Sequence, residues 1–320
     1  MLRMNFLTAV AVTLAATSAQ ADVQLSVATG GTGGVYYPLG GGVAEVINNN
    51  IDGYSATAEV TGASVENVSL VASGDADLAF VLGNVAIQAY GGAGRFEEQA
   101  VSQLRAVSTI YSNMIQIVAL ADSGITSLDD LRGKRVSIGA PGSGNEVNSS
   151  QVLGANGITY DDFDEQRLNF NETADALGNG DIDVGIWSVG APTSSILNLS
   201  TVHDITVVPL TDTQIDAVIA KYPTYSRTTM AGGTYKGLDA DMAVLGIPNV
   251  LVASAEMDED EVYQITKAIY ENLGDLQAVH PAAKETSVEL AMGSTPIPLH
   301  PGAIRYFEEI GATIPYKLRP

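Results

Sequence analysis

The pattern that most constrains the fold of this chain occurs twice. Residues 25–47 (LSVATGGTGGVYYPLGGGVAEVI) and residues 135–153 (RVSIGAPGSGNEVNSSQVL) each predict a strand, a glycine-rich turn and a helix. Each is followed by a second matching unit, SGDADLAFVLGNVAIQ from Ser73 and NGDIDVGIWSVGAPTS from Asn179. Because order and spacing are kept, the sequence predicts two α/β lobes that present backbone N–H groups at helix N-termini to one shared cleft. That geometry suits a small anion.

The first 21 residues have the composition of a secretory signal peptide. Arg3 precedes the apolar run FLTAVAVTLAA, and Ala19-Gln20-Ala21 fits an A-x-A cleavage site. The apolar run is too short to span a bilayer, and no later stretch reaches that length. We therefore expect cleavage after Ala21 and a mature chain, beginning at Asp22, that works outside the cytoplasm without membrane insertion. A retained, uncleaved anchor is the alternative.

Charge and composition exclude several classes of function. The chain has 37 Asp and Glu against 15 Lys and Arg, a formal net charge of −22. Binding to nucleic acid needs basic patches, so such a partner is not expected. The acidity indicates solubility, with an acidic docking surface as the alternative. The chain has no cysteine, which excludes disulfides, thiol nucleophiles and thiolate metal sites.

The order of predicted elements indicates how the two lobes are connected. Short strands alternate with helices almost throughout, which favours a mostly parallel sheet flanked by helices in each lobe. Continuous β regions near residues 104–120 and 242–253 predict two crossings between lobes. Lobe I is therefore expected to comprise 22–111 plus 247–320, and lobe II 112–246. The two crossing strands would form a hinge.

Nucleotide chemistry and catalysis find little support in the motifs. The sequence has no G-x-x-x-x-G-K-[ST], and Tyr36 occupies the third glycine position of a G-x-G-x-x-G pattern. The three histidines, His203, His280 and His300, are best interpreted as loop or capping residues. No H-E-x-x-H and no G-x-S-x-G motif is present. We predict no catalytic residue, no cofactor and no metal site.

Two pairs of carboxylates could suggest acid–base chemistry. Asp75 and Asp77 precede one strand of the repeated G-D-x-D unit, and Asp181 and Asp183 precede the other. Both pairs are thus expected at the strand ends away from the cleft. A role in turns and caps is favoured.

Binding residues should gather at the carboxyl ends of the strands, the usual ligand edge of α/β sheets. Trp187, the single tryptophan, could cover the carbon skeleton of a ligand or pack in the core. Tyr36 could bond the ligand or staple the helix start. No arginine lies in these loops, and Arg95, the nearest in sequence, is expected at the surface. The segments predicted to reach the cleft are Thr29–Tyr36, Gly62–Ser64, Leu82–Asn84, Tyr111–Asn113, Ala140–Asn145 and Trp187–Val189.

Seven motifs, taken in order, resemble one known family across essentially the whole mature chain. They are GGTGGVYYPLGG, TGASVENV, SGDADLAFV, SLDDLRGKRVSIGAPGSGNE, IPNVLVAS, PLHPGAIRYF and the signal peptide. Together they are similar to the TAXI-type solute receptors of TRAP transporters. The resemblance implies a periplasmic, two-lobe, type II periplasmic-binding-protein fold that closes on its ligand. It also implies a TRAP-type membrane permease as partner, driven by an ion gradient, and ligands that are small carboxylates.

The resemblance also assigns part of the binding site. It carries over the first glycine turn, a serine of the next turn and the start of the second glycine turn, and, less directly, Asn84 and Trp187. Tyr111 and Ser188 are added from their expected place at the hinge and the sheet edge. The predicted ligand-binding residues are Gly31, Thr32, Gly33, Gly34, Val35, Tyr36, Ser64, Asn84, Tyr111, Ser143, Gly144, Trp187 and Ser188.

The sequence therefore predicts a secreted, non-enzymatic capture protein for a small organic anion. The ligand would be a mono- or dicarboxylate or a glutamate-like amino acid, held by both glycine turns and delivered to the permease. Two alternatives remain open. The chain could be a ligand-sensing subunit for a membrane signalling receptor, or an enzyme of the same fold, which would need a catalytic base in the cleft.

Overall fold

The computed structural model describes residues 23–320, so the predicted signal peptide, residues 1–21, lies outside the described residues. The strands are β1 (Val23–Ala28), β2 (Tyr54–Glu59), β3 (Leu78–Leu82), β4 (Leu104–Leu120), β5 (Arg135–Ser137), β6 (Asp164–Gln166), β7 (Val184–Val189), β8 (Ile205–Val207), β9 (Ser226–Met230) and β10 (Met242–Ser254). The α-helices are α1 (Tyr36–Asn50), α2 (Ser64–Ser73), α3 (Gly83–Gly91), α4 (Gly144–Ala155), α5 (Phe170–Asn179), α6 (Ser194–Val202), α7 (Asp212–Lys221), α8 (Glu259–Glu271), α9 (Leu273–Val279), α10 (Val288–Ser294) and α11 (Pro301–Glu309).

The strands join into one hydrogen-bonded path, β2-β1-β3-β10-β4-β7-β5-β6, with β8 on β4 and β9 on β10. The three strands at each end of the path pair in parallel. β4 and β10 pair antiparallel with each other and with their other neighbours. The expected parallel sheets are thus present as three-stranded groups, because each of those strands is followed by a helix that returns the chain to the same edge.

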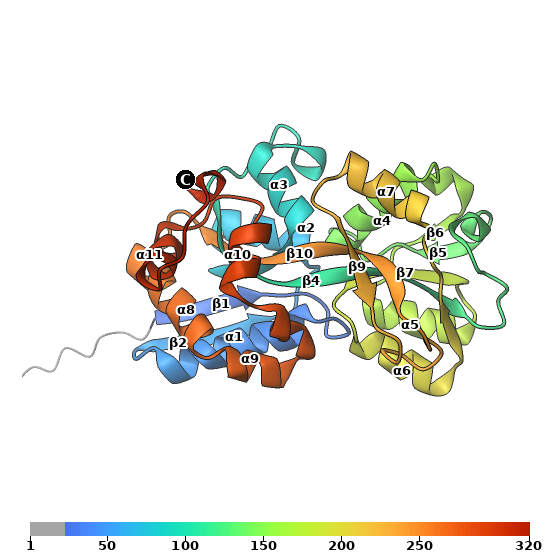
Figure 1. Cartoon of the computed structure of the whole chain (residues 1–320), viewed down its shortest axis with the longest axis horizontal. Helices are drawn as coiled ribbons and strands as arrows, with labels where there is room; N and C mark the ends of the chain where they lie inside the picture. Colours follow the sequence, from blue (N-terminus) through green and yellow to red (C-terminus); the bar gives the residue numbers. More distant parts are fainter. Residues whose placement is uncertain (1–22) are drawn as a thin grey trace, which may run out of the picture.

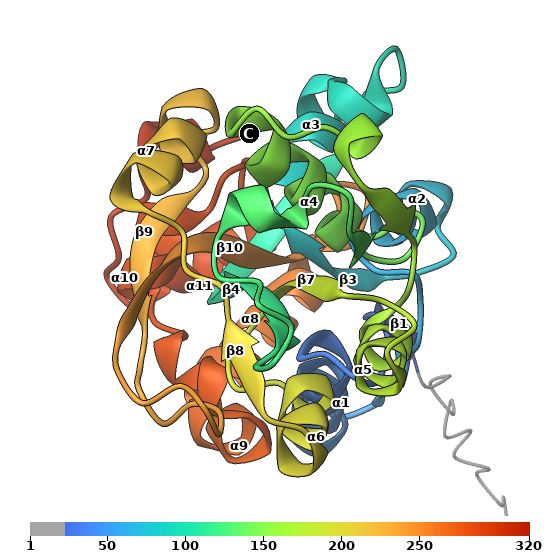
Figure 2. The same ribbon diagram turned by 90° about the vertical axis from the view of Figure 1, so that its right-hand side faces the viewer.

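The two long strands lie in the middle of the molecule and join its two halves (Figure 1). One half carries α1–α3 and the C-terminal helices α8–α11, and the other carries α4–α7. Figure 2 shows helices on both sides of the sheet, with α4 and α7 on one side and α5 and α6 on the other. The chain therefore has a two-lobe α/β fold. We keep lobe I (22–111 and 247–320) and lobe II (112–246) as the proposed division.

Pro248 lies within the second crossing strand without breaking it. β10 continues from Met242 to Ser254 and pairs with β9 up to Gly246 and with β3 from Asn249. Pro248 falls between these two paired segments. Its missing N–H therefore interrupts neither ladder, which is how a proline is accommodated within a long strand.

The aspartates of the repeated G-D-x-D unit cap strands in both lobes. Asp77 Oδ2 accepts a hydrogen bond from the backbone N–H of Ser26 at 2.8 Å. Asp183 Oδ2 accepts one from the backbone N–H of Arg135, also at 2.8 Å. The predicted role in turns and caps holds for both residues, and the equivalence supports the internal repeat.

A buried asparagine ties the cleft ends of two strands together in each lobe. In lobe I, Asn67 Nδ2 donates to the carbonyls of Thr29 and Phe80, at 2.7 and 2.8 Å. In lobe II, Asn145 Nδ2 donates to the carbonyls of Ile138, just after β5, and Ile186, within β7, at 3.1 and 2.8 Å. These bonds join the strand ends through buried carbonyl groups, and in lobe II Ser149 Oγ also donates to the Ile138 carbonyl, at 2.9 Å.

The substitution Asn67→Ala tests this role. Because it leaves two buried carbonyls unpaired, we expect it to lower the free energy of unfolding by about 2–3 kcal/mol. Denaturant unfolding monitored by circular dichroism measures the change. Asn198→Ala, on the exposed face of α6, is the control and should change the free energy by less than about 0.5 kcal/mol. Equal effects of the two substitutions would contradict the assignment.

Candidate functional site

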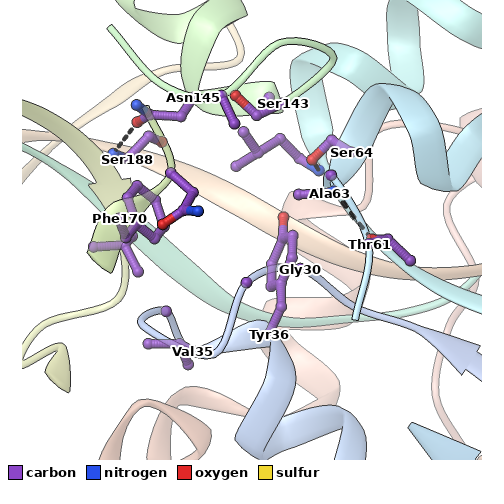
Figure 3. Close-up of a pocket in the computed structure, with 18 of the residues that line it drawn as sticks. Gly30, Val35, Tyr36, Thr61, Ala63, Ser64, Ser143, Asn145, Phe170 and Ser188 are labelled. Carbon is purple, nitrogen blue, oxygen red and sulfur yellow. Dashed lines mark hydrogen bonds between the residues drawn. The ribbon is translucent and has the colours of Figure 1, made fainter. Parts of the chain in front are cut away.

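A cavity of about 240 Å³ lies between the two halves of the molecule. Both lobes contribute to its wall, and Figure 3 shows Tyr36, Ser64 and Ser143 around it with Phe170 and Ser188 on the other side. The residues that line it are Gly30, Gly31, Gly34, Val35, Tyr36, Val60, Thr61, Gly62, Ala63, Ser64, Leu82, Tyr111, Asn113, Ala140, Ser143, Gly144, Asn145, Asn169, Phe170, Ser188 and Val189. None of these side chains is charged.

Four helices, α1, α2, α4 and α5, begin at the cavity wall. At α1 no side chain caps the helix start, and the N–H groups of Val35 and Tyr36 have no partner among the described residues. At α4 Ser143 caps only Glu146, which leaves the N–H groups of Gly144 and Asn145 unpaired in the same sense. The two glycine turns of the sequence repeat thus keep free donors at the cavity.

The donors at the other two helix starts are used in part. The carbonyl of Gly142 in lobe II accepts from the N–H groups of Val65 and Glu66 in α2, at 3.2 and 3.4 Å. The side chain of Asn169 accepts from two N–H groups in the first turn of α5. The first N–H groups of these two helices, at Ser64 and Phe170, have no partner among the described residues and lie on the wall, so all four helix starts offer a backbone donor.

Three serines on the wall also have donors to offer. Ser64 Oγ accepts from the N–H of Leu82 at 3.1 Å, and Ser143 Oγ accepts from Glu146 N–H at 3.1 Å. Ser188 Oγ accepts from the amide of Asn148 at 2.7 Å. Because each oxygen already accepts, each hydroxyl hydrogen is available for a group in the cavity.

A buried chain of hydrogen bonds forms the floor of the site. The Tyr36 hydroxyl donates to Asn249 Oδ1 at 2.5 Å, and Asn249 Nδ2 donates to Asn113 Oδ1 at 2.8 Å. Asn113 Nδ2 then donates to the carbonyl of Ser188 at 2.8 Å. The chain runs from α1 through both crossing strands to β7. It therefore fixes the amides of the hinge strands relative to both lobes.

Tyr111 is the exception to this pairing. Its side chain is fully buried and lines the cavity, but its hydroxyl has no hydrogen-bond partner among the described residues. Burial, and secondarily the nearby Tyr36 and Glu285, raises the pKa of Tyr111 well above its ordinary value. Burial also raises the pKa of Tyr36. Both phenols are therefore protonated at neutral pH, and that of Tyr111 is a donor without an acceptor.

The structure brings most of the predicted site residues to the cavity wall. Thr32 and Gly33 lie beside it and contact lobe II, where Asn171 Nδ2 donates to Thr32 Oγ1 at 3.2 Å. Asn84 is buried behind the wall and donates to lobe II side chains. The predicted residues on the wall are Gly31, Gly34, Val35, Tyr36, Ser64, Tyr111, Ser143, Gly144 and Ser188.

Trp187 packs in the core, which is the second of the two roles that the sequence allowed. Its side chain is fully buried, and the indole N–H donates to Ser195 Oγ at 3.2 Å. The ring stacks on Phe170, with centroids 6.5 Å apart. Phe170 lines the cavity and Trp187 does not, because β7 turns the tryptophan into the core of lobe II.

The start of α5 is the part of the site that sequence reasoning missed. Asn169 and Glu172 form a complete capping box before α5, and Asn169 and Phe170 both line the cavity. The N-x-x-E spacing of this segment was the available signal. Asn249 was missed as well, because nothing local marks an asparagine within a long strand as part of a cleft.

The S-x-x-E spacing of Ser143 and Glu146 at the second glycine turn matches a capping box, but only half of that box is formed. Ser143 caps Glu146 N–H, but the Glu146 carboxylate accepts from Gly142 N–H instead of Ser143 N–H. It also pairs with Arg167 at 3.1 Å and with Arg95 at 2.9 Å. Arg95 is half-exposed, as expected, yet it links lobe I to the nearly buried Glu146 of lobe II. These arginines thus neutralise a carboxylate beside the site without lining it.

Residues 23–320 lack two features that bear on the site. No helix in this part of the chain is long and apolar enough to cross a membrane. Within the same residues, no group of three or more His, Asp or Glu side chains is placed to hold a metal ion.

Comparison with known proteins defines first the class and then the family. A solved protein from Bordetella bronchiseptica RB50 is similar at a TM-score of 0.53 and 17% identity, covering 92% of this chain and 91% of that one. The ligand-binding component of an ABC-type import system from Staphylococcus aureus gives 0.50 and 11%, covering 84% and 81%. The periplasmic aliphatic sulphonate binding protein SsuA from Escherichia coli gives 0.46 and 14%, covering 89% and 83%.

The first two of these similarities show that the chain has a two-lobe periplasmic-binding-protein fold. The model of the NMT1-like family matches residues 27–311. The chain therefore belongs to the NMT1-like family.

Two tyrosine substitutions with opposite expected signs test the geometry of the cavity. Tyr111→Phe removes a buried hydroxyl that has no partner, so we expect the free energy of unfolding of the ligand-free protein to rise by about 1 kcal/mol. Tyr36→Phe removes the donor to Asn249 and should lower it by about 1 kcal/mol. Urea unfolding of both variants measures the difference. A loss of stability in both would show that the Tyr111 hydroxyl has a protein partner.

Proposed function

We propose that this protein is an extracytoplasmic solute receptor that captures a small carboxylate between its lobes and delivers it to a TRAP-type membrane permease. The observation that carries the proposal is that the starts of α1 and α4, one from each lobe, present free backbone N–H groups at one uncharged cavity. The sequence resemblance to TAXI-type receptors supports the choice of permease. The segment proposed as a signal peptide supports a periplasmic location.

A carboxylate fits the donors that the cavity offers. Free N–H groups at a helix start and the partial positive charge of the helix dipole favour an anion, and their effect is greatest away from water. The hydroxyls of Tyr111 and of the three serines add further donors. A site of this kind needs no arginine, and the net charge of −22 acts on the ligand only weakly because salt screens it beyond about 8–10 Å.

Contacts across the proposed lobe boundary indicate that the structure is in a closed state. Thr193 Oγ1 donates to the carbonyl of Gly33 at 2.9 Å. Asn84 donates to Asn148 at 2.7 Å, and the Arg95–Glu146 ion pair adds a third link. A ligand that touches both glycine turns would favour this state over an open one, and the closed form would dock on the permease.

A thermal-shift screen of the mature protein tests the carboxylate assignment. Small carboxylates, amino acids, sugars and inorganic anions are each added in excess, and the unfolding midpoint is measured. A ligand that binds only the folded state raises the midpoint by mass action. We expect the shift with carboxylates. A shift confined to sugars or inorganic anions would overturn the carboxylate assignment, and mass spectrometry of denatured protein would identify any ligand that copurifies.

The substitution Gly144→Ala tests closure. A Cβ at Gly144 would lie against Leu82 Cδ1 and 2.9 Å from Ser64 Cβ, both in lobe I. Because this contact forms only when the lobes meet, we expect at least tenfold weaker binding of the carboxylate found in the screen, or about 1.4 kcal/mol. Isothermal titration calorimetry measures it.

Gly154→Ala, in the same helix, is the matched control because a Cβ there meets nothing within 4 Å. The affinity of the Gly154→Ala variant for the same carboxylate should equal that of the unsubstituted protein. Unchanged affinity in Gly144→Ala would mean that the ligand binds without this lobe contact.

A further inference from the structure

We infer that the ligand carries a single carboxylate and no ammonium group, and that the rest of it is apolar. This inference rests on the proposed function and narrows it, since the sequence left mono- and dicarboxylates and glutamate-like amino acids open. It follows from an inventory of the acceptors, the charges and the apolar groups on the cavity wall.

The wall has no charged acceptor for an ammonium group. It contains no carboxylate, and every serine, threonine and asparagine oxygen on it already accepts from a protein N–H group. The three serine oxygens do so as described above. The Thr61 hydroxyl accepts from Ala63 N–H at 3.0 Å, and Asn145 Oδ1 accepts from Ser188 N–H at 2.5 Å.

The remaining two amides complete this inventory. Asn113 Oδ1 accepts from Asn249, and Asn169 Oδ1 accepts from the first turn of α5. What the wall offers instead is donors. A charged ammonium has three N–H donors and no acceptor, so placing it here would bury a charge opposite unpaired donors. The cavity therefore rejects α-amino acids.

The wall also has no side chain to neutralise a second carboxylate. The nearest arginines, Arg95 and Arg167, are both committed to Glu146, and neither lines the cavity. The free backbone donors belong to helix starts that border one cavity of about 240 Å³. One carboxylate can use them, while a second would be desolvated without a cation.

The rest of the wall is apolar. Val35 and Tyr36 lie on one side of the cavity and Phe170 on another (Figure 3), and Leu82 and Val189 also line it. Phe170 is held in place by stacking on the buried Trp187. A branched aliphatic chain would gain free energy by leaving water for this surface.

Four compounds of matched shape test the inference by isothermal titration calorimetry. 4-Methylpentanoate presents one carboxylate and an isopropyl group. L-Leucine adds only the ammonium group, butanedioate replaces the isopropyl group with a carboxylate of similar shape, and 4-methylpentanamide removes the charge. We expect 4-methylpentanoate to bind at least tenfold more tightly than each of the other three.

The outcomes separate this inference from the proposed function. Leucine or butanedioate binding as tightly as 4-methylpentanoate would overturn the inference and leave the carboxylate receptor standing. The amide binding as tightly as the acid, or none of the four binding at millimolar concentration, would overturn both. The Ser188→Asp variant adds an independent readout, because it places a carboxylate on the wall that can pair with an ammonium group. The ratio of the affinity for 4-methylpentanoate to the affinity for leucine should fall at least tenfold in this variant.

Discussion

The antiparallel pairing of β4 with β10 is the interaction on which the rest of the structure depends. These strands connect the two lobes: β10 pairs with β3 of lobe I and β9 of lobe II, and β4 pairs with β7 of lobe II. Their register places Asn249 opposite Tyr111, beside the cavity. The ladder that holds the lobes together therefore also supplies the floor of the binding site. A change in register would remove Tyr111 and Asn113 from the cavity together.

In the proposed receptor, β4 and β10 both connect the lobes and form the floor of the cavity, which couples ligand binding to lobe closure. The hydrogen-bond chain from Tyr36 to Ser188 passes through Asn249 and Asn113, so groups from both lobes are oriented by the hinge itself. The wall is complete only where α1 of lobe I meets α4 of lobe II. A ligand that needs both sets of donors has different affinity for open and closed forms, which is the condition for a population shift.

A strongly acidic protein can bind an anion because salt screening and the dielectric constant differ between its surface and a buried site. At the surface, charges are screened by salt and act weakly on a distant ligand. In the cavity, oriented N–H groups act at short range in a medium of low dielectric constant. The Glu146 carboxylate beside α4 would oppose an anion, but Arg95 and Arg167 pair with it. The protein thus obtains a positive local potential without placing a cation on the wall.

The sequence by itself determined the repeat and the two glycine turns. These motifs are local, and the helices after the glycine turns begin where the pattern ends, whereas the strands that Asp77 and Asp183 cap lie 51 and 48 residues away in the chain. The two-lobe class followed, because strand–helix alternation allows few other arrangements. Nine of the thirteen predicted site residues line the cavity for the same reason.

Only the tertiary structure decided the remaining features. It turned Trp187 into the core and put Phe170 on the wall, since the pleat of β7 and the approach of α5 set which face of each meets the cleft. It also brought Asn249 next to Asn113, which are 136 residues apart in the chain. Whether an oxygen still has a free lone pair depends on such distant partners. The donor-rich character of the cavity could therefore not be predicted from residue types alone.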